Sequence, residues 1–240
     1  MSRLVLENLV KTYAGKTVVN EVNLTVKQGK VTGLLGPNGA GKTTTFYMTV
    51  GMIRPDGGTV YLDQADITQH PMYIRARKGI GYLPQESSIF KKLTVRENIT
   101  AILEVLPANG FDIETKAQIL MDELGIARLS HQKAASLSGG ERRRLEIARV
   151  LATDPKFILL DEPFAGIDPL AVIDIQKIIS QLTGRGIGVL ISDHNVRETL
   201  GVCDHAYIMN QGAVIESGSP EKIISSEIAK KIYLGDNFKL

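Results

Sequence analysis

The chain has 240 residues and carries 28 basic and 26 acidic side chains, which gives a net charge of +2. This length allows one domain with a sizeable core, and the near balance of charge argues against a nucleic-acid partner. Cys203 is the only cysteine, which excludes an internal disulfide and a multi-thiolate metal site and fits a reducing compartment. No apolar run approaches the ~20 residues of a membrane span, so we expect a cytoplasmic protein.

Strands are predicted in two groups. Three segments of the first third alternate apolar and polar positions, as half-buried strands of an antiparallel layer do: residues 3–13, 18–26 and 58–62. Three others are short apolar runs rich in branched side chains, as in strands covered on both faces: residues 31–36, 157–161 and 187–193. We therefore expect an antiparallel layer beside a parallel core sheet.

A helical subdomain is predicted between these strands. Apolar residues between Val95 and Leu129 recur at helical spacing, and "PANGFD" at 107–112 interrupts the pattern. The spaced positions are Ile99, Ile102, Leu103, Leu106, Ile119, Leu120 and Leu124. We expect this subdomain to span about residues 92–150 of a single 240-residue domain.

The segment "GPNGAGKT" matches the phosphate-binding loop G-x-x-x-x-G-K-[ST], and it lies between a predicted strand and a predicted helix. Glycines let backbone amides curl around phosphates, and the N-terminus of the following helix adds positive potential. Lys42 is expected to reach the terminal phosphates, and Thr43 to ligate Mg²⁺. The expected phosphate-binding residues are Gly36, Pro37, Asn38, Gly39, Ala40, Gly41, Lys42, Thr43 and Thr44.

Two predicted strands end in residues suited to phosphate chemistry. Asp161 and Glu162 close the apolar run at 157–161, and His194 follows the next such run. Parallel strands present their carboxyl ends at one edge of a sheet, so these side chains should lie near the phosphate loop. We predict that Asp161 holds Mg²⁺ through water, that Glu162 polarises the attacking water and that His194 contacts a terminal phosphate.

The stretch "LSGGE" predicts the start of a helix whose N-terminus also binds a phosphate. Ser138 and Glu141 fit a capping box, S-x-x-E, which by itself needs no glycine. Gly139 and Gly140 cost about 1 kcal/mol each inside a helix, but they bare the positive helix end for a large anion. A second phosphate-binding helix end points to a homodimer that clamps ATP between its subunits.

These motifs together resemble the nucleotide-binding domain of ABC transporters, and the resemblance covers essentially the whole chain. It implies the P-loop NTPase ABC ATPase fold, an α/β architecture with a mixed RecA-like core sheet, an antiparallel β layer and a helical subdomain. It also implies an ATPase that uses ATP and Mg²⁺. By the same resemblance Tyr13 would stack on adenine, Gln85 would sense Mg²⁺ and the membrane partner, and residues 165–168 would contact the other subunit.

Within the family the chain is most similar to the ATPase subunits of lipopolysaccharide export systems of Gram-negative bacteria. The segments that carry this likeness include "GIGYLPQESSIF", "DEPFAGIDPLAVIDI" and "YLGDNFKL". The resemblance implies permease subunits on separate chains and a peripheral position on the cytoplasmic face of the inner membrane. The ATPase of a branched-chain amino-acid importer remains the alternative, because its motor residues would be the same.

Three further segments leave alternatives open. Phe90, with Lys91 and Lys92 after it, is either an apolar anchor for a membrane partner or a core residue. The C-terminal tail, about residues 228–240, is too apolar to be disordered, and it docks either on its own body or, as we favour, on the twin subunit. Residues 142–144 are all arginine, but three consecutive helical residues spread over roughly 200° and form no single patch for nucleic acid.

Overall fold

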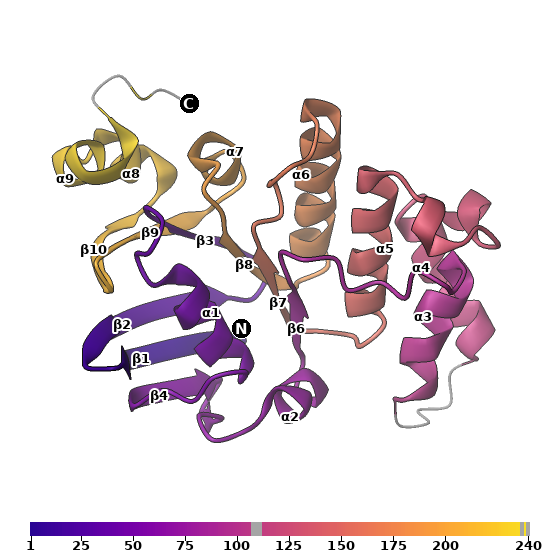
Figure 1. The fold of residues 1–240 in the computed structure, drawn as a ribbon, viewed down its shortest axis with the longest axis horizontal. Coiled ribbons are helices and arrows are strands. Elements are labelled where there is room, and N and C mark those ends of the chain that lie inside the picture. The colour runs from indigo at the N-terminus through magenta and orange to yellow at the C-terminus, as the bar shows by residue number, and fades with distance from the viewer. Residues whose placement is uncertain (107–111, 236–237, 239–240) are drawn as a thin grey trace.

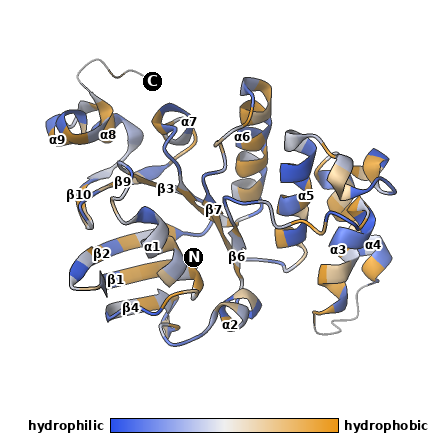
Figure 2. Ribbon diagram, viewed as in Figure 1, coloured by the Kyte–Doolittle hydropathy of each residue, from blue (hydrophilic) through white to orange (hydrophobic). Residues whose placement is uncertain are grey.

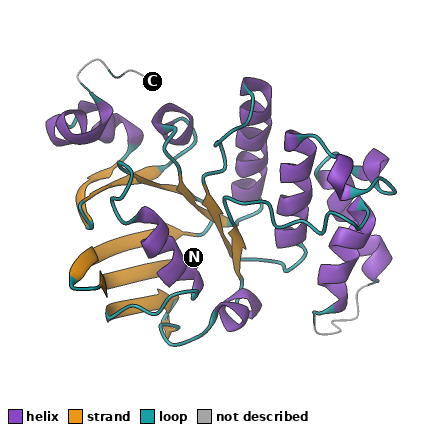
Figure 3. Ribbon diagram, in the orientation of Figure 1, coloured by secondary structure: helices purple, strands orange, loops and turns teal. Residues whose placement is uncertain are grey.

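Two β-sheets and a group of helices form the molecule in the computed structural model (Figure 1). The structure describes residues 1–106, 112–235 and 238. Both sheets are flanked by helices, and α3, α4 and α5 gather at one end of the molecule, with α5 packed against β6 (Figure 3). Across the described ranges, no helix is long and apolar enough to cross a membrane.

The antiparallel layer forms as predicted from the alternating segments. Its strands lie in the order β2-β1-β4-β5, and their bounds are β2 Lys16–Lys27, β1 Arg3–Tyr13, β4 Gly57–Leu62 and β5 Ala65–Asp66. Their inward residues, among them Leu4, Leu6 and Val26, are fully or almost fully buried. The alternation therefore places one face on the core, as period-two patterning requires.

The second sheet contains the predicted parallel strands. Its order is β10-β9-β3-β8-β7-β6, with bounds β10 Ala213–Gly218, β9 His205–Asn210, β3 Val31–Leu35, β8 Gly188–Ser192, β7 Phe157–Asp161 and β6 Ile80–Leu83. All pairs from β9 to β6 are parallel, and β10 pairs antiparallel with β9. Every residue of β3, β7 and β8 is buried, which explains their continuous apolar runs.

Helix α1, Lys42–Val50, packs between the two sheets, and α2, Met72–Arg77, closes one end of it (Figure 1). The contact between α1 and α2 depends on Arg75, which is 1% exposed. Its guanidinium donates hydrogen bonds of 2.7–2.8 Å to the carbonyls of Met48, Thr49, Thr68 and His70. Two of these are carbonyls of the last turn of α1, which a cation suits. Burial lowers the pKa of Arg75 to about 10, so the side chain stays charged at neutral pH.

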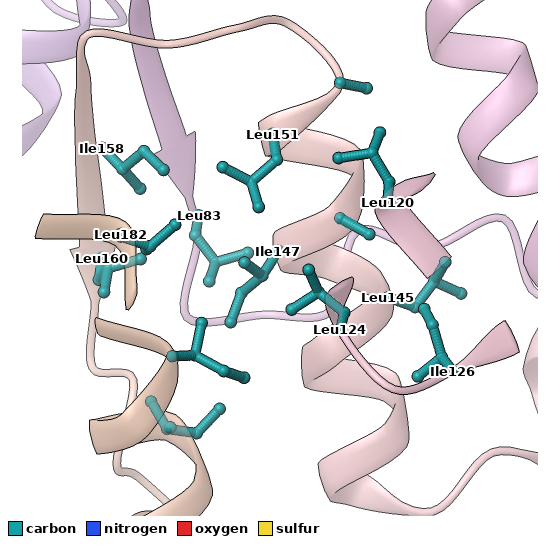
Figure 4. Packing of buried hydrophobic residues seen from close by; sticks show 14 of the residues in the cluster. Leu83, Leu120, Leu124, Ile126, Leu145, Ile147, Leu151, Ile158, Leu160 and Leu182 are labelled. Carbon is teal, nitrogen blue, oxygen red and sulfur yellow. The ribbon is translucent and has the colours of Figure 1, made fainter. Parts of the chain in front are cut away.

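The helical group shares one apolar core with the parallel sheet. It comprises α3 Val95–Glu104, α4 Ile113–Glu123 and α5 Gly139–Leu151, with 3₁₀ turns at Ala127–Leu129 and Ala134–Ser136. Figure 4 shows Ile147 of α5 between Leu120 on one side and Leu160 on the other, and Leu145 of the same helix beside Ile126. The expectation for Ile119 was wrong, because that side chain is 50% exposed and Ala117 and Met121 are buried instead.

Helices α5 and α6, Pro169–Gly184, lie side by side but differ in composition (Figure 2). Helix α6 is coloured largely hydrophobic, and α5 largely hydrophilic, because α5 carries the three consecutive arginines. Arg142 donates to the carbonyl of Leu137, Arg143 is buried beside Glu146, and Arg144 pairs with Asp174 of α6. The arginines point to separate partners, as the helical spacing predicts.

The last helices pack on β3, β9 and β10 of the second sheet. They are α7 Val196–Leu200, α8 Pro220–Ser225, α9 Glu227–Ala229 and a π-helical turn Lys230–Leu234. Tyr233, Leu234 and Phe238 pack on a core cluster that includes Leu35 and Ile208 of the same chain. In this single chain the tail therefore docks on its own body, and Ile232 remains 39% exposed. Leu240, another apolar tail residue, lies outside the described residues.

Replacing Arg75 with Met should lower the free energy of unfolding by about 3–5 kcal/mol, because three buried carbonyls and one part-buried carbonyl lose a charged donor. Urea denaturation followed by circular dichroism measures the loss. Arg77→Met is the matched control, since Arg77 lies exposed in the same helix and should cost less than about 1 kcal/mol. Equal effects of the two substitutions would contradict the role assigned to Arg75.

Candidate nucleotide site

The carboxyl ends of three neighbouring strands form the floor of the site. The register pairs Leu34 of β3 with Ser192 of β8, and Ser192 with Asp161 of β7. The loop after β3, the acidic pair at the end of β7 and the histidine after β8 therefore start from one row across the sheet. This is the edge where open parallel sheets bind ligands.

The loop after β3 adopts a backbone that requires glycine. Gly36, Gly39 and Gly41 have φ angles of 147°, 77° and 101°. A Cβ atom at Gly36 would lie 2.1 Å from the carbonyl oxygen of Met209, and one at Gly41 would lie 2.4 Å from that of Val18. The glycines thus allow the loop to turn tightly against β9 and β2 before α1 begins at Lys42.

Lys42 is folded into the loop that precedes it. The side chain is 8% exposed, and its Nζ donates to the carbonyls of Gly36 at 2.7 Å and Pro37 at 3.0 Å. Burial lowers the pKa of Lys42, while the charges of Glu162, Asp161 and Asp193 oppose that shift. The ammonium is therefore held by backbone carbonyls at the centre of the loop.

A cavity of about 330 Å³ opens over this loop. Asn38 to Thr44 line it together with Glu162 and with Lys16 and Val18 of β2. Lys16 and Val18 were missed by the sequence reasoning, because only the fold brings the start of β2 beside the loop. Tyr13 does not line this cavity; its ring is 44% exposed and lies 5.4 Å from the Nζ of Lys11.

Asp161 is a buried carboxylate at the end of β7. It is 3% exposed, and the hydroxyl of Tyr82 lies 3.4 Å from its Oδ2. Burial, followed by the negative charge of Glu162, raises the pKa of Asp161 to about 6. Within the described residues, no three or more His, Cys, Asp or Glu side chains are grouped to hold a metal. The predicted Mg²⁺ ligands are instead a hydroxyl, an amide and a carboxylate, from Thr43, Gln85 and Asp161.

Glu162 contacts two of the other predicted residues, Gln85 and His194. Its φ angle of 46° places it in the left-handed region, and its N–H donates to the carbonyl of Ser192 at 2.6 Å. The Nε2 of Gln85 donates to Glu162 Oε2 at 2.8 Å, and His194 Nδ1 lies 3.4 Å from the same oxygen. Gln85 thus meets Glu162 directly, rather than Asp161 or Thr43. The strained backbone at Glu162 is of the kind found at functional sites.

Asp193 is a structural member of the site that the sequence reasoning missed. It is fully buried; its Oδ2 accepts the N–H of Phe164 and its Oδ1 accepts the N–H of Asn195. Burial raises the pKa of Asp193, and these N–H bonds act against the rise. The carboxylate ties the loop after β7 to the loop after β8. Its position directly before His194 was the available signal.

The glycine-bared helix end of α5 faces a different cavity. The capping box is present: Ser138 Oγ accepts the N–H of Glu141 at 3.4 Å, and Glu141 Oε2 accepts the N–H of Ser138 at 3.0 Å. Gly139 lines a cavity of about 180 Å³ with Gln85 and Glu162, whereas Ser138, Gly139 and Gly140 do not line the cavity over the phosphate loop. Within one chain these three residues are therefore separate from that loop.

Comparison with known proteins decides the family. The sequence profile described as ABC transporter matches residues 19–165. The chain belongs to the ABC transporter family. This ABC ATPase is 54% identical over 241 residues to the lipopolysaccharide export system ATP-binding protein of Escherichia coli K12, with 100% of both chains covered. It is 55% identical to the protein of the same name from Haemophilus influenzae, again over 100% of both chains.

Solved structures agree with this assignment. The ADP conformation of an ATP-binding cassette of an ABC transporter matches with a TM-score of 0.89 and 31% identity, covering 98% of this chain and 100% of that one. A dimeric cassette in a post-hydrolysis state, bound to ADP and Pi, matches with a TM-score of 0.80 and 25% identity, covering 90% and 98%. The predicted ABC ATPase fold is confirmed, and the ABC ATPase binds nucleotide.

Replacing Gly36 with Ala should lower nucleotide affinity at least about tenfold, because the new Cβ would displace the loop from Met209. Titration with a fluorescent ATP analogue measures the affinity. The control is Gly186→Ala: this glycine also has a positive φ, of 79°, but meets only a side-chain atom at 4.0 Å and lies outside the loop. That variant should lose about 1 kcal/mol of stability and keep its affinity. Unchanged affinity in Gly36→Ala would contradict the loop assignment.

Proposed function

We propose that this ABC ATPase powers lipopolysaccharide export from the inner membrane of a Gram-negative bacterium. The observation that carries the proposal is identity of 54–55% to relatives named for that export system, over the full length of both chains. The site geometry supplies the motor chemistry. It leaves the cargo undetermined, because a phosphate site for ATP does not depend on what is transported.

The phosphate loop fits the triphosphate of ATP. Backbone amides of residues 38–44, the N-terminus of α1 and the ammonium of Lys42 present positive potential to one cavity. The buried carboxylate of Asp161 and the exposed hydroxyl of Thr43 fit a divalent cation, since Asp161 has no cation at bonding distance among the described residues. When bound, Mg²⁺ would offset negative charge on the terminal phosphates.

Glu162 is the proposed general base. It lines the loop cavity, its carboxylate is held by Gln85, and His194 lies against the same oxygen. In this arrangement Glu162 accepts a proton from the water that attacks the γ-phosphate. His194 is proposed to contact that phosphate, and Gln85 to orient Glu162. The three side chains come from three separate strand ends, so all depend on the register of the sheet.

Glu162→Gln should reduce ATP turnover at least about a hundredfold and leave ATP affinity nearly unchanged, because the proton acceptor is lost while the phosphate contacts remain. Phosphate release and nucleotide titration measure the two quantities. Glu104→Gln, at the exposed end of α3, is the charge-matched control and should behave as wild type. Turnover near the wild-type rate in Glu162→Gln would reject Glu162 as the base.

We further propose that two copies share each ATP. Ser138, Gly139 and Gly140 do not line the phosphate-loop cavity of their own chain, so they would complete the cavity of a second copy. The helix end carries the exposed Gly139 and the half-buried Gly140, and the hydroxyl of Ser138 donates to Glu141 Oε2 at 2.8 Å, so that hydroxyl would have to leave Glu141 to meet an anion. A dimeric cassette bound to ADP and Pi among the structural relatives supports this arrangement.

A mixing experiment tests the shared site. Ser138→Arg and Lys42→Ala chains should each be inactive alone, because every site in either homodimer carries one defect. Mixed in equal amounts, half of the dimers pair the two variants, and one of their two sites is intact. Turnover should return to about a quarter of the wild-type value. Absence of any recovery, with mixed dimers demonstrated by crosslinking, would contradict the shared site.

The membrane partner is proposed to dock near Phe90. This ring is 46% exposed, which favours the anchor interpretation over the core one, and the guanidinium of Arg149 lies 4.5 Å from its centroid. An exposed aromatic with a neighbouring arginine is typical of interface hot spots. The chain would then sit peripherally on the cytoplasmic side of the membrane through its partners.

Co-purification from mild detergent extracts tests whether the transported molecule is lipopolysaccharide. An affinity-tagged chain should recover membrane subunits that carry a large periplasmic domain, together with lipopolysaccharide. Phe90→Ala should reduce this recovery at least about tenfold, while the exposed Tyr73→Ala variant serves as control. Recovery of permease subunits of an amino-acid importer would overturn lipopolysaccharide export and leave the ATPase assignment intact.

A further inference from the structure

A cavity of about 550 Å³ lies at the opposite end of β3 from the phosphate loop. Its walls come from β1, β2, β3 and β9: the register pairs Arg3 with Lys27, and Thr32 with His205. The phosphate loop, by contrast, follows Leu35 at the other end of the strand. This volume is within the usual range for small-molecule sites.

Unpaired positive charge is concentrated in this cavity. Arg3, Lys27 and Lys30 line it, against the single carboxylate of Asp204. Both oxygens of Asp204 are already used, one by Lys30 Nζ at 2.7 Å and the other by the N–H of Val31 at 2.8 Å. Among the described residues, neither the Arg3 nor the Lys27 side chain has a carboxylate partner. Two cations are therefore left to attract an anion.

Neutral hydrogen-bonding groups complete the lining. Thr25, Thr32 and Tyr207, each with a hydroxyl, line the same cavity, and Thr32 is 2% exposed. Tyr207 Oη accepts the N–H of Thr25 at 3.2 Å, which leaves its own proton for a ligand oxygen. The ring of His205 packs edge-on against Tyr207, with 4.9 Å between centroids. Cations and hydroxyl donors together are the groups that bind phosphate oxygens.

We propose that this cavity binds a small phosphate-bearing anion, at a site separate from the ATP site. Arg3 and Lys27 supply the charge, the hydroxyls of Thr32 and Tyr207 supply directed hydrogen bonds, and His205 forms the aromatic wall. Such a ligand would join β1, β2 and β9 across the two sheets. The site does not depend on the proposed cargo.

The electrostatics at His205 agree with this assignment. Burial and then the charges of Lys27 and Lys222 lower the pKa of His205. Lys222, from α8, is paired with Glu216 of β10, and Asp204 is the neighbouring acid on the chain. A bound dianion would stabilise the imidazolium and raise the pKa of His205.

Proton NMR of the histidine ring protons provides a local test on the full chain. The resonances of His205 and His194 are assigned by single His→Gln variants, so that His205 reports this cavity and His194 reports the phosphate loop. Inorganic phosphate is titrated against chloride at equal ionic strength. The pKa of His205 should rise by about one unit and saturate. The double variant Arg3→Gln/Lys27→Gln should abolish the rise, whereas the exposed control Lys78→Gln/Lys177→Gln should retain it.

Three outcomes would overturn the proposal. The response of His205 could be linear and equal in phosphate and chloride, which would indicate charge screening alone. It could persist in the Arg3/Lys27 variant, which would place the anion elsewhere. It could also be absent with inorganic phosphate but appear as line broadening with phosphatidylglycerol vesicles and not with phosphatidylcholine vesicles. That last result would indicate that Arg3 and Lys27 bind anionic lipid at a membrane surface and not a soluble phosphate.

Discussion

Backbone pairing among β3, β8 and β7 is the constraint on which the rest of the molecule depends. All three strands are buried on both faces. Residues 31–34 of β3 pair without a break with 189–192 of β8, and residues 188–192 of β8 pair without a break with 157–161 of β7. A slip of one residue would move every side chain to the other face of the sheet, so the core holds the register firmly. The phosphate loop, the acidic pair and His194 are consequently delivered to one edge.

The same edge is where unfavourable conformations and buried charges are concentrated. Glu162 has a left-handed backbone, and Asp161 is a buried carboxylate with one hydroxyl neighbour. Asp193, by contrast, is satisfied by two N–H groups, which makes it a structural tie between loops. Buried charge without a full set of partners costs stability unless a ligand supplies them. This contrast separates the residues that face ligand from those that hold the site together.

Helix α5 connects this site to the surface proposed for the membrane partner. Its N-terminus carries the capping box at Ser138, and Arg143 donates to the carbonyl of Pro84, directly before Gln85. One turn and a half further on, Arg149 donates to the carbonyl of Ser88 and lies over Phe90. The loop between β6 and α3 is thus held along its length by one helix. Both Phe90 and the backbone directly before Gln85 therefore contact arginines of the same helix.

The amino-acid sequence by itself determined the strands β1, β2, β3, β4, β7 and β8, the phosphate loop, the acidic pair and the capping box, because each depends on local spacing and backbone preference. The strands β5, β6, β9 and β10 were recognised only in the structure. Tertiary structure alone decided that Lys16 and Val18 line the cavity, that Gln85 meets Glu162 and that Tyr13 stays outside that cavity. It also placed Tyr233, Leu234 and Phe238 against the core of their own chain, and it brought Arg3, Lys27 and His205 together. These contacts join residues far apart in the chain, and their distances follow from how the two sheets pack, which no local pattern encodes.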